Sequence, residues 1–328
     1  MRIAVTGSIA TDHLMTFPGR FTESLVAEQL NNVSLSFLVE DLDIRRGGVA
    51  ANICFGMAVL GLNPTLVGAV GEDFEDYRSW LERHGVDTES VHVSELRHTA
   101  RFLCTTDADH NQIASFYPGA MTEARNIELG AVARRLGALD LVVIGPNDPE
   151  AMVRHTDECR DRGIPFVADP SQQLARMGRD EIRQLVDGAS YLFTNEYEAA
   201  LTEQKTGWSS DEILERVSTR ITTHGAKGAV VERKGEEPVR VACPKEKSKT
   251  DPTGVGDAFR AGFLAGVAWG LPYGRCAEVG SLLATHVIET VGTQEYELGR
   301  RHFLERLGEA YGPGAVADVE PHLRCPRP

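Results

Sequence analysis

Residues 251–257 read DPTGVGD, and they lead into a helical run of small residues, AFRAGFLAGVAWG, over residues 258–270. Gly254 and Gly256 at a helix start let backbone N–H groups converge on an anion because no Cβ stands in the way, and the helix dipole adds to the attraction. Asp257 then lies in the first turn, where its carboxylate can accept a proton from a hydroxyl beside a bound phosphoryl group. The stretch predicts a phosphate or oxyanion site with a candidate general base. A tight turn followed by a favourable first-turn acid is the alternative.

Around this stretch, short apolar runs alternate with helical patterns. The expected strands are mostly apolar throughout, as in strands buried on both faces, and they span residues 2–8, 65–70, 139–145, 165–169, 191–194, 220–223 and 229–232. The expected helices span residues 49–60, 74–84, 149–162, 211–218, 258–269 and 275–290. This alternation predicts an α/β fold with a doubly wound, mostly parallel sheet.

Two stretches, at about residues 14–46 and 91–118, break the alternation. They hold short candidate strands, at 33–39, 100–106 and 112–117, with no helix long enough to cross over. We therefore expect a small antiparallel sheet inserted into a domain of residues 1–312 and hinged over the carboxyl ends of the parallel strands as a lid. Residues 313–328 contain four prolines and are expected to form a loose tail.

Composition narrows the class of protein. The 328 residues carry 34 Lys and Arg against 48 Asp and Glu, a formal net charge of −14, which argues against binding nucleic acid or an anionic membrane. No apolar stretch approaches the length of a membrane span. The cysteines form no CxxC pair, which predicts reduced thiols in a cytoplasmic protein rather than a disulfide framework or a zinc site; they are Cys54, Cys104, Cys159, Cys243, Cys276 and Cys325.

Two other nucleotide-binding motifs are absent. The dipeptide Gly-Lys occurs nowhere in the chain, which excludes a Walker A loop. Gly254 and Gly256 form a GxG, but Phe259 occupies the place of the third glycine and the preceding residues are polar, so a dinucleotide-binding fingerprint is not formed. An NAD-dependent enzyme is therefore the weakest of the alternatives.

Further candidate positions precede and follow the central strands. Gly47 and Gly48 allow close backbone approach of a ligand, and Asn52 offers a donor and an acceptor from the next helical turn. Asp12 follows the first strand, where a carboxylate can hold a vicinal diol. Asn195 begins an N-x-x-E element, and Gly225 and Gly228 follow another strand. Each position has a structural alternative: a helix entry for the first glycines and Asn52, a surface turn for Asp12, a helix cap for Asn195 and a hairpin for the last two glycines.

The order of these elements resembles the ribokinase-like (PfkB) carbohydrate and nucleoside kinase family, from residue 3 to about residue 295. The matching elements are Gly47-Gly48…Asn52, Asn195…Glu198 and Asp251…Asp257. Longer strings, such as TGSIATDHL, SFYPGA and DPTGVGDAFRAGF, are similar to the bacterial adenosine kinase branch. The resemblance implies a ribokinase-like fold and transfer of the γ-phosphoryl group of ATP to the 5′-hydroxyl of adenosine, giving AMP and ADP in purine salvage.

The resemblance also implies a role for each motif residue. Asp257 would be the catalytic base, and the backbone of Gly254, Val255 and Gly256 would form the anion hole. The ribose side would be formed by Ser8, Asp12, Ser36, Gly48 and Asn52. Phosphate, Mg²⁺ and ATP would be held by Asn195, Glu198 (on Mg²⁺ through water), Thr223, Gly225, Gly228 and Gly256.

The identity of the substrate depends on the lid. Phe102 and Phe116 lie on two candidate lid strands, where aromatic faces can sandwich a purine, and Gln172 and Gln173 can approach the same pocket. Packing of both phenylalanines inside the lid, and a surface position for the glutamines, are the alternatives. A kinase for ribose, fructose or another nucleoside and a non-catalytic nucleoside-binding module therefore stay open.

Partners and ions follow from the same resemblance. The expected partners are a nucleoside and ATP, and an exposed lid sheet predicts a homodimer. Related kinases bind a monovalent cation, which here would contact backbone near residues 251–253 and 291–292. The sequence leaves open whether K⁺ is required and whether GTP can replace ATP.

Overall fold

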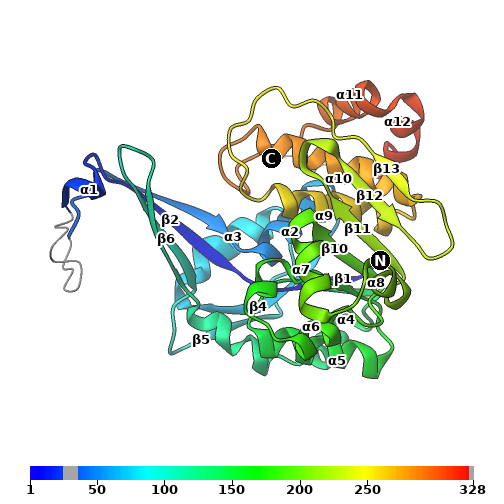
Figure 1. Ribbon diagram of the computed structural model, residues 1–328, viewed down its shortest axis with the longest axis horizontal. Helices are drawn as coiled ribbons and strands as arrows, with labels where there is room; N and C mark the ends of the chain where they lie inside the picture. Colours follow the sequence, from blue (N-terminus) through cyan, green and yellow to red (C-terminus); the bar gives the residue numbers. More distant parts are fainter. Residues whose placement is uncertain (25–35, 325–328) are drawn as a thin grey trace.

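The computed structural model describes residues 1–24 and 36–324 of the chain, and its elements form a compact body with one projecting arm (Figure 1). The strands are β1 (Ile3–Thr6), β2 (Ala10–Thr16), β3 (Asp41–Gly47), β4 (Thr65–Gly71), β5 (Val91–Ser94), β6 (Ala100–Thr106), β7 (Gln112–Tyr117), β8 (Leu141–Ile144), β9 (Phe166–Ala168), β10 (Tyr191–Asn195), β11 (Thr219–Thr223), β12 (Ala229–Glu232) and β13 (Val239–Val241). The α-helices are α1 (Phe21–Ser24), α2 (Val49–Val59), α3 (Glu75–Arg83), α4 (Leu129–Leu136), α5 (Pro149–Arg162), α6 (Arg179–Val186), α7 (Glu196–Thr206), α8 (Ser210–Arg216), α9 (Val255–Ala268), α10 (Tyr273–Ile288), α11 (Arg300–Tyr311) and α12 (Pro313–Val319). Short 3₁₀ turns are η2 (Glu72–Phe74), η3 (Gly119–Asn126), η4 (Ser171–Ala175) and η5 (Gly225–Lys227).

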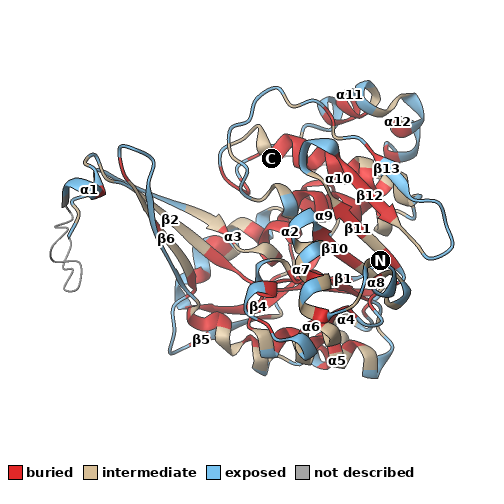
Figure 2. Ribbon diagram, viewed as in Figure 1, coloured by how far each residue is buried: buried red, intermediate tan, exposed pale blue. Residues whose placement is uncertain are grey.

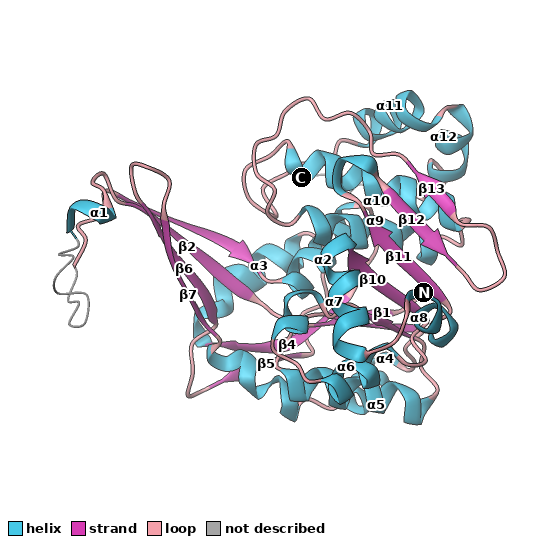
Figure 3. Cartoon of the chain, in the orientation of Figure 1, coloured by secondary structure: helices cyan, strands magenta, loops and turns pink. Residues whose placement is uncertain are grey.

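The main sheet of the described chain has nine strands in the order β13-β12-β11-β10-β9-β8-β1-β4-β5. Seven neighbouring strands of this sheet, β11, β10, β9, β8, β1, β4 and β5, run parallel, and β12 and β13 are added antiparallel at one edge. Helices cover both faces (Figure 3). The predicted doubly wound, mostly parallel sheet is confirmed. Because β1 lies between β4 and β8, the strand order reverses at β1, and ligands of open α/β sheets bind at such a reversal.

The core lies on both faces of this sheet because its strands are apolar throughout. Along β8, Leu141 and Val143 join the cluster under α2, α9 and α10, while Val142 and Ile144 join the cluster under α4, α5 and α6. Both pairs are almost fully excluded from solvent, and Figure 2 shows the buried class along the strands of the main sheet and on the helices beside it. The strands therefore form a rigid platform whose carboxyl ends carry the polar loops.

The lid is a separate four-stranded sheet, β3-β2-β6-β7, which projects from the body as the arm on the left of Figure 1. Its two antiparallel pairs are joined by parallel pairing of β2 with β6, so the sheet is mixed rather than antiparallel. It begins at Ala10, earlier than the predicted start, and β5 belongs to the main sheet, where it pairs with β4.

Two other sequence predictions differ from the structure. The candidate strand at 33–39 falls partly on residues that are not described, and residues 36–39 are not strand; the lid strand is β3, where Leu42 and Ile44 alternate with charged residues. The tail predicted to be loose is packed as far as residue 324: α12 buries Ala315 and Val319, and Leu323 follows them into the core. Residues 325–328 lie outside the described part of the chain.

The cysteines within the described residues are free thiols, and four of them are buried: Cys54, Cys104, Cys159 and Cys276. Cys325 lies outside those residues. Among the described residues, no helix combines the length and apolar character needed to cross a bilayer.

Candidate active site

The N-terminus of α9 is the centre of the site. Gly254 caps this helix with a left-handed backbone, φ 75°, and a Cβ at this position would come within 2.8 Å of the Thr293 side chain. Only glycine adopts this conformation in this space without strain. The first backbone N–H groups of α9 therefore face outward with no helical partner, as an anion site requires.

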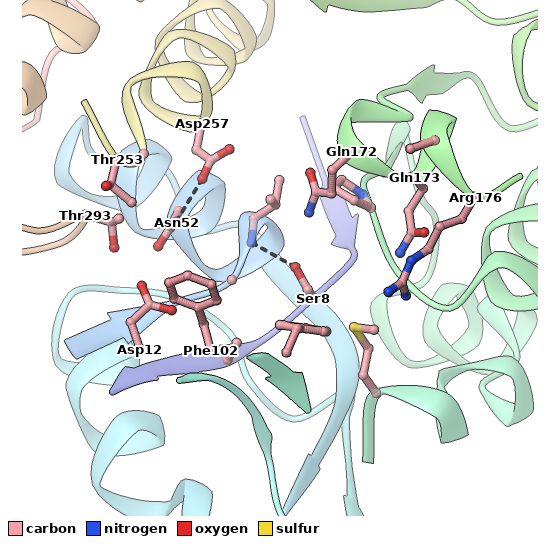
Figure 4. Close-up of a pocket in the computed structure, with 18 residues that line it drawn as sticks. Ser8, Asp12, Asn52, Phe102, Gln172, Gln173, Arg176, Thr253, Asp257 and Thr293 are labelled. Atoms are coloured by element: carbon pink, nitrogen blue, oxygen red, sulfur yellow. Dashed lines mark hydrogen bonds between the residues drawn. The ribbon is translucent and has the colours of Figure 1, made fainter. Parts of the chain in front are cut away.

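A first cavity of about 480 Å³ lies between the lid and the carboxyl ends of β1, β8 and β9. Figure 4 shows Asp12 and Phe102 on its lid side, Gln172 and Gln173 across from them, and Asp257 with Asn52 at its end. All but one of the residues predicted to bind the acceptor line it: Ser8, Asp12, Gly48, Asn52, Phe102, Phe116, Gln172 and Gln173. Its volume and its mixed polar and aromatic lining suit a small ligand such as a nucleoside.

A second cavity of about 380 Å³ lies on the other side of the α9 N-terminus. It is lined by residues predicted on the ATP side, namely Asn195, Thr223, Gly225, Gly228 and Gly256. Val255 and Phe259 of α9 and Ala284 and Ile288 of α10 close it with apolar surface. Gly254 and Asp257 line the first cavity while Val255 and Gly256 line the second. A group passing between the two cavities would therefore meet the helix N-terminus.

Asp257 has the electrostatics of a proton acceptor. Burial raises the pKa of its carboxyl from 3.8 to about 6, while the positive charge of Arg260 and a hydrogen bond from Asn52 act in the opposite direction. Asn52 Nδ2 donates to Asp257 Oδ2 at 2.8 Å. A carboxyl with a pKa near 6 is ionised at neutral pH and is more basic than an ordinary aspartate.

Arg260 lies one turn after Asp257 on α9, and its side chain is buried beneath the site. Its guanidinium contacts both carboxylate oxygens of Asp169, at 2.6 and 2.7 Å, and lies 3.9 Å from Glu198. Asp169 is fully buried. The sequence shows Arg260 as a charged residue in a helix of small residues, and this signal went unused in the sequence analysis.

Asp12 lies at the root of the lid, on β2, where it is registered with Arg45 of β3 and Phe102 of β6. Burial raises the pKa of Asp12 to about 6, while the positive charge of Arg45 acts to lower it. A Cβ on Gly47 would come within 2.9 Å of the Asp12 carboxylate, so Gly47 leaves room for this side chain. Asp12 is thus presented to the first cavity as an acceptor for hydroxyl groups.

Ser8 and Gly48 shape the helix entry beside Asp12. Ser8 Oγ accepts a hydrogen bond from Val49 N at 3.0 Å, which satisfies an N–H at the start of α2. Gly48 has φ 94°, and a Cβ there would come within 2.7 Å of the backbone at Ile9 and Ala10. The loop after β1 and the start of α2 therefore fit together through these two residues.

Asn195 and Glu198 form a reciprocal cap at the start of α7. Asn195 Oδ1 accepts from Glu198 N, and Glu198 Oε2 accepts from Asn195 N, both at 2.8 Å. The capping alternative is therefore present, and Asn195 also lines the second cavity. Glu198 Oε2 also lies 3.9 Å from the Arg260 guanidinium, and the role of Glu198 on Mg²⁺ through water stays a prediction.

The loops predicted to hold a monovalent cation lie together. Asp251 accepts hydrogen bonds from Thr253 N at 2.9 Å and from Gly292 N at 3.0 Å. Asp251 also lies 3.5 Å from Arg45 of the lid. The structure thus joins residues 251–253 to the loop after α10, and the cation itself stays a prediction.

Ser36 is the one predicted ribose residue that the structure places elsewhere. It is exposed beside Phe37, whose ring contacts Phe17 and Phe21 at the tip of the lid. Asp12 and the tip residue Thr16 are four strand residues apart, about 13 Å. Ser36 therefore does not line the first cavity. Only the resemblance to the ribokinase-like family had placed Ser36 on the ribose side, and residues 36–39 do not form a strand.

The sequence analysis missed several residues that line the first cavity, including Met121, Arg176 and Thr293. Arg176 follows η4 and faces the cavity across from Phe102 (Figure 4). Nothing in the sequence marks an arginine after a 3₁₀ turn as a ligand-facing residue. Only the fold brings it opposite the lid.

Known proteins are similar to this chain in sequence. The model of the pfkB family of carbohydrate kinases matches residues 6–298. A nucleoside kinase of Methanocaldococcus jannaschii is 30% identical over 250 residues, which cover 76% of this chain and 80% of that protein.

Solved structures of nucleoside kinases are similar to this chain in both sequence and fold. A nucleoside kinase of Burkholderia thailandensis, in complex with inosine, is 34% identical and superimposes with a TM-score of 0.83 over 94% of this chain and 99% of that one. A second structure of that protein is in complex with ADP-inosine. An adenosine kinase of Sinorhizobium meliloti is 23% identical, with a TM-score of 0.69 over 89% of this chain and 95% of that one, and it shows a shared fold.

Proposed function

Because the chain belongs to the pfkB family of carbohydrate kinases, whose members use ATP to phosphorylate hydroxyl groups, we propose that it is a nucleoside kinase acting on the 5′-hydroxyl of purine nucleosides, adenosine among them. The observation that carries this proposal is the position of Asp257. It lies at the helix N-terminus where an acceptor-sized cavity meets a second cavity lined by the residues expected on the ATP side.

The proposed reaction needs one proton acceptor and an electropositive cradle. As the 5′-oxygen attacks the γ-phosphorus of ATP, its proton passes to the Asp257 carboxylate, and the bond from the γ-phosphorus to the bridging oxygen of ADP breaks. The unpaired N–H groups at the start of α9 would stabilise charge on the transferring group. Mg²⁺, held through water by Glu198, would neutralise phosphate charge. Products are a nucleoside monophosphate and ADP.

The lid end of the first cavity has residues suited to binding a purine base. Phe102 and Phe116 are paired across β6 and β7 on the cavity face of the lid. Gln173 Nε2 donates to Asn147 O at 2.7 Å, which fixes the amide and leaves Oε1 buried with no partner in the described residues. The neighbouring Gln172 is exposed in the same cavity, where its amide oxygen can accept from the 6-amino group of adenine or from N1–H of hypoxanthine, and Arg176 offers donors to a 6-oxo group. We therefore expect adenosine and inosine both to be phosphorylated.

The test is ADP formation from Mg·ATP with adenosine, inosine, guanosine, ribose and fructose, each with and without K⁺. Turnover confined to nucleosides would support the proposal, and preference for a free sugar would discard the two phenylalanines as base platforms. Stimulation by K⁺ would support a cation at the Asp251 loop. Nucleoside binding without any turnover would favour a binding module instead.

The role of the base is tested by Asp257→Asn. We expect turnover to fall by about 10²–10⁴, with nucleoside and ATP affinities nearly unchanged by calorimetry. Asp161→Asn, at an exposed position on α5, is the matched control and should behave as wild type. Wild-type turnover in Asp257→Asn would exclude the assigned role.

A homodimer through the lid is part of the same proposal. On the face opposite Asp12 and Phe102, the register places Leu42, Met15, Thr105 and Ile113 in one row across the sheet, and Leu42 and Ile113 are exposed. Exposed apolar residues on a projecting sheet favour pairing with a second copy. Light scattering should give twice the monomer mass, and Leu42→Asp with Ile113→Asp should halve it.

A further inference from the structure

A buried chain of hydrogen bonds ends on the candidate base. Tyr77 OH donates to Gly47 O at 2.9 Å, and Gln294 Nε2 donates to Tyr77 OH at 2.5 Å and to Asn52 Oδ1 at 2.9 Å. Asn52 Nδ2 then donates to Asp257 Oδ2 at 2.8 Å (Figure 4 shows this last bond). The chain joins α3, the loop after α10, α2 and α9.

The direction of every bond in this chain is fixed by chemistry. Gly47 O can only accept, so the Tyr77 hydroxyl proton must be donated to it, and the phenolic oxygen is left to accept. The Asp257 carboxylate also accepts, so Asn52 must turn its Nδ2 toward it and its Oδ1 away. Only an N–H donor can serve both remaining acceptors, and the two hydrogens of Gln294 Nε2 supply both bonds.

Gln294 donates two hydrogen bonds through Nε2, but its own side-chain oxygen accepts none from the described residues. Its side chain is 1% exposed, and Oε1 has no partner among the described residues. A buried acceptor without a partner costs stability, but an apolar side chain of similar length would leave Asn52 Oδ1 without its donor instead. What glutamine provides at this position is two donors, one for Asn52 Oδ1 and one for Tyr77 OH.

The surroundings hold Gln294 in place between the lid and the phosphate side. Thr293 Oγ1 donates to Arg46 O at 2.8 Å, which ties the loop to the root of the lid. The Thr293 side chain packs on Gly254, the cap of α9. The loop is therefore seated against both elements that frame the first cavity.

From this geometry we propose that Gln294 and Tyr77 are positioning residues, which hold the Asn52 amide with its Nδ2 toward Asp257 and so fix the carboxylate for proton acceptance. The second Nδ2 hydrogen of Asn52 remains free for a hydroxyl group in the cavity. Without Gln294, Asn52 can rotate and place Oδ1 against the carboxylate, where like partial charges repel. The proposal rests on the proposed kinase function, because its readout is turnover.

The test compares wild type with Gln294→Met, which keeps side-chain length and removes both donors. We expect kcat to fall by about 10- to 100-fold, the scale of a mispositioned catalytic group, with KM for ATP and Kd for the nucleoside within about threefold of wild type. Since the Asn52 donor lowers the pKa of Asp257, the midpoint of the kcat–pH curve should also move to higher pH. A purely structural residue would not move that midpoint.

Tyr77→Phe provides a second variant that retains the ring. It removes the acceptor of one Gln294 hydrogen, and we expect a smaller fall in kcat, about 3- to 10-fold. Tyr191→Phe is the control: it also removes a partly buried tyrosine hydroxyl and keeps the ring, but it lies at the amino end of β10, whereas Asn195 at the carboxyl end of that strand lines the second cavity.

The outcomes separate the two proposals. No nucleoside-dependent ADP formation by the wild type would overturn the proposed function. An active wild type, together with variants whose kcat is within twofold and whose pH midpoint is unmoved, would overturn the positioning role alone. Loss of nucleoside affinity in step with kcat would also overturn it, because the residues would then act in binding. If Gln294→Met does not fold, Tyr77→Phe decides between these outcomes.

Discussion

Lowering the pH should slow the enzyme in a way that separates its two unusual aspartates. The Asp257 carboxyl has its pKa raised to about 6 by burial, and it must be ionised to accept a proton. The ionised fraction is then about 0.97 at about pH 7.5 and about 0.1 at about pH 5. We therefore expect kcat, which reports groups in the substrate complex, to fall about tenfold over this range with a limiting slope of one.

Asp12 adds a second titration that kcat does not report. Burial raises its pKa to about 6 as well, and the free enzyme must ionise it to accept hydrogen bonds from the ribose hydroxyls. Because kcat/KM reports the free enzyme, both carboxyls contribute to it. We expect kcat/KM for the nucleoside to fall about 100-fold between about pH 7.5 and about pH 5, with a limiting slope of two.

The assay measures ADP directly by chromatography at constant ionic strength, with ATP and Mg²⁺ saturating, so that no coupling enzyme adds its own pH dependence. Asp12→Asn should reduce the limiting slope of kcat/KM from two to one and leave the kcat profile unchanged. Titration of the ATP phosphates would persist in this variant, so it cannot produce the change of slope. A kcat that stays constant to about pH 5 would refute the assignment of Asp257, and an unchanged slope in Asp12→Asn would refute that of Asp12.

Three further outcomes are expected. Asp257→Asn should raise the free energy of unfolding at about pH 7.5 by about 1–2 kcal/mol. The reason is that the pKa of Asp257 is higher in the folded than in the unfolded protein, so wild-type stability is lost as pH rises through about 6. Thermal unfolding should show that this gain in stability becomes smaller toward about pH 5. Phe102→Ala should raise KM for nucleosides about 5- to 100-fold without affecting KM for ATP, whereas Phe17→Ala at the lid tip should not. Arg260→Met should cost about 3–5 kcal/mol in urea unfolding, because it leaves Asp169 buried and unpaired, and adding Asp169→Asn should recover most of the loss.

The sequence motifs located both cavities because each motif is local. DPTGVGD is a helix start that can be read from seven adjacent residues, and its glycines are required by the left-handed cap at Gly254 and by the space beside it. The apolar strands were also predictable, since strands buried on both faces carry a continuous apolar run. Local chemistry therefore predicted the sheet and the glycine-capped helix start between the two cavities, and the anion site itself stays a prediction.

The lid strands and the C-terminal helix were harder to predict from the sequence, because each segment carries features that favour two different structures. In β3, the sequence DLDIRRG has the period-two pattern of a strand, but charged residues dominate it, and the more apolar residues 33–39 were chosen instead. In the tail, Pro313 at the first turn of a helix favours the helix rather than disorder. Ala315, Val319 and Leu323 follow at a spacing of four and bury one face. Proline content alone was the wrong signal there.

The residues that tune the base could not be predicted, because their partners lie far away along the chain. Gln294 meets Asn52 across 242 positions, and Arg260 meets Asp169 across 91. Two groups beside these contacts are buried unfavourably: Gln294 Oε1 has no partner among the described residues, and burial raises the pKa of the Asp257 carboxyl. Both groups are linked through Asn52 to the N-terminus of α9, and this arrangement supports the proposed role of Asp257 as a proton acceptor.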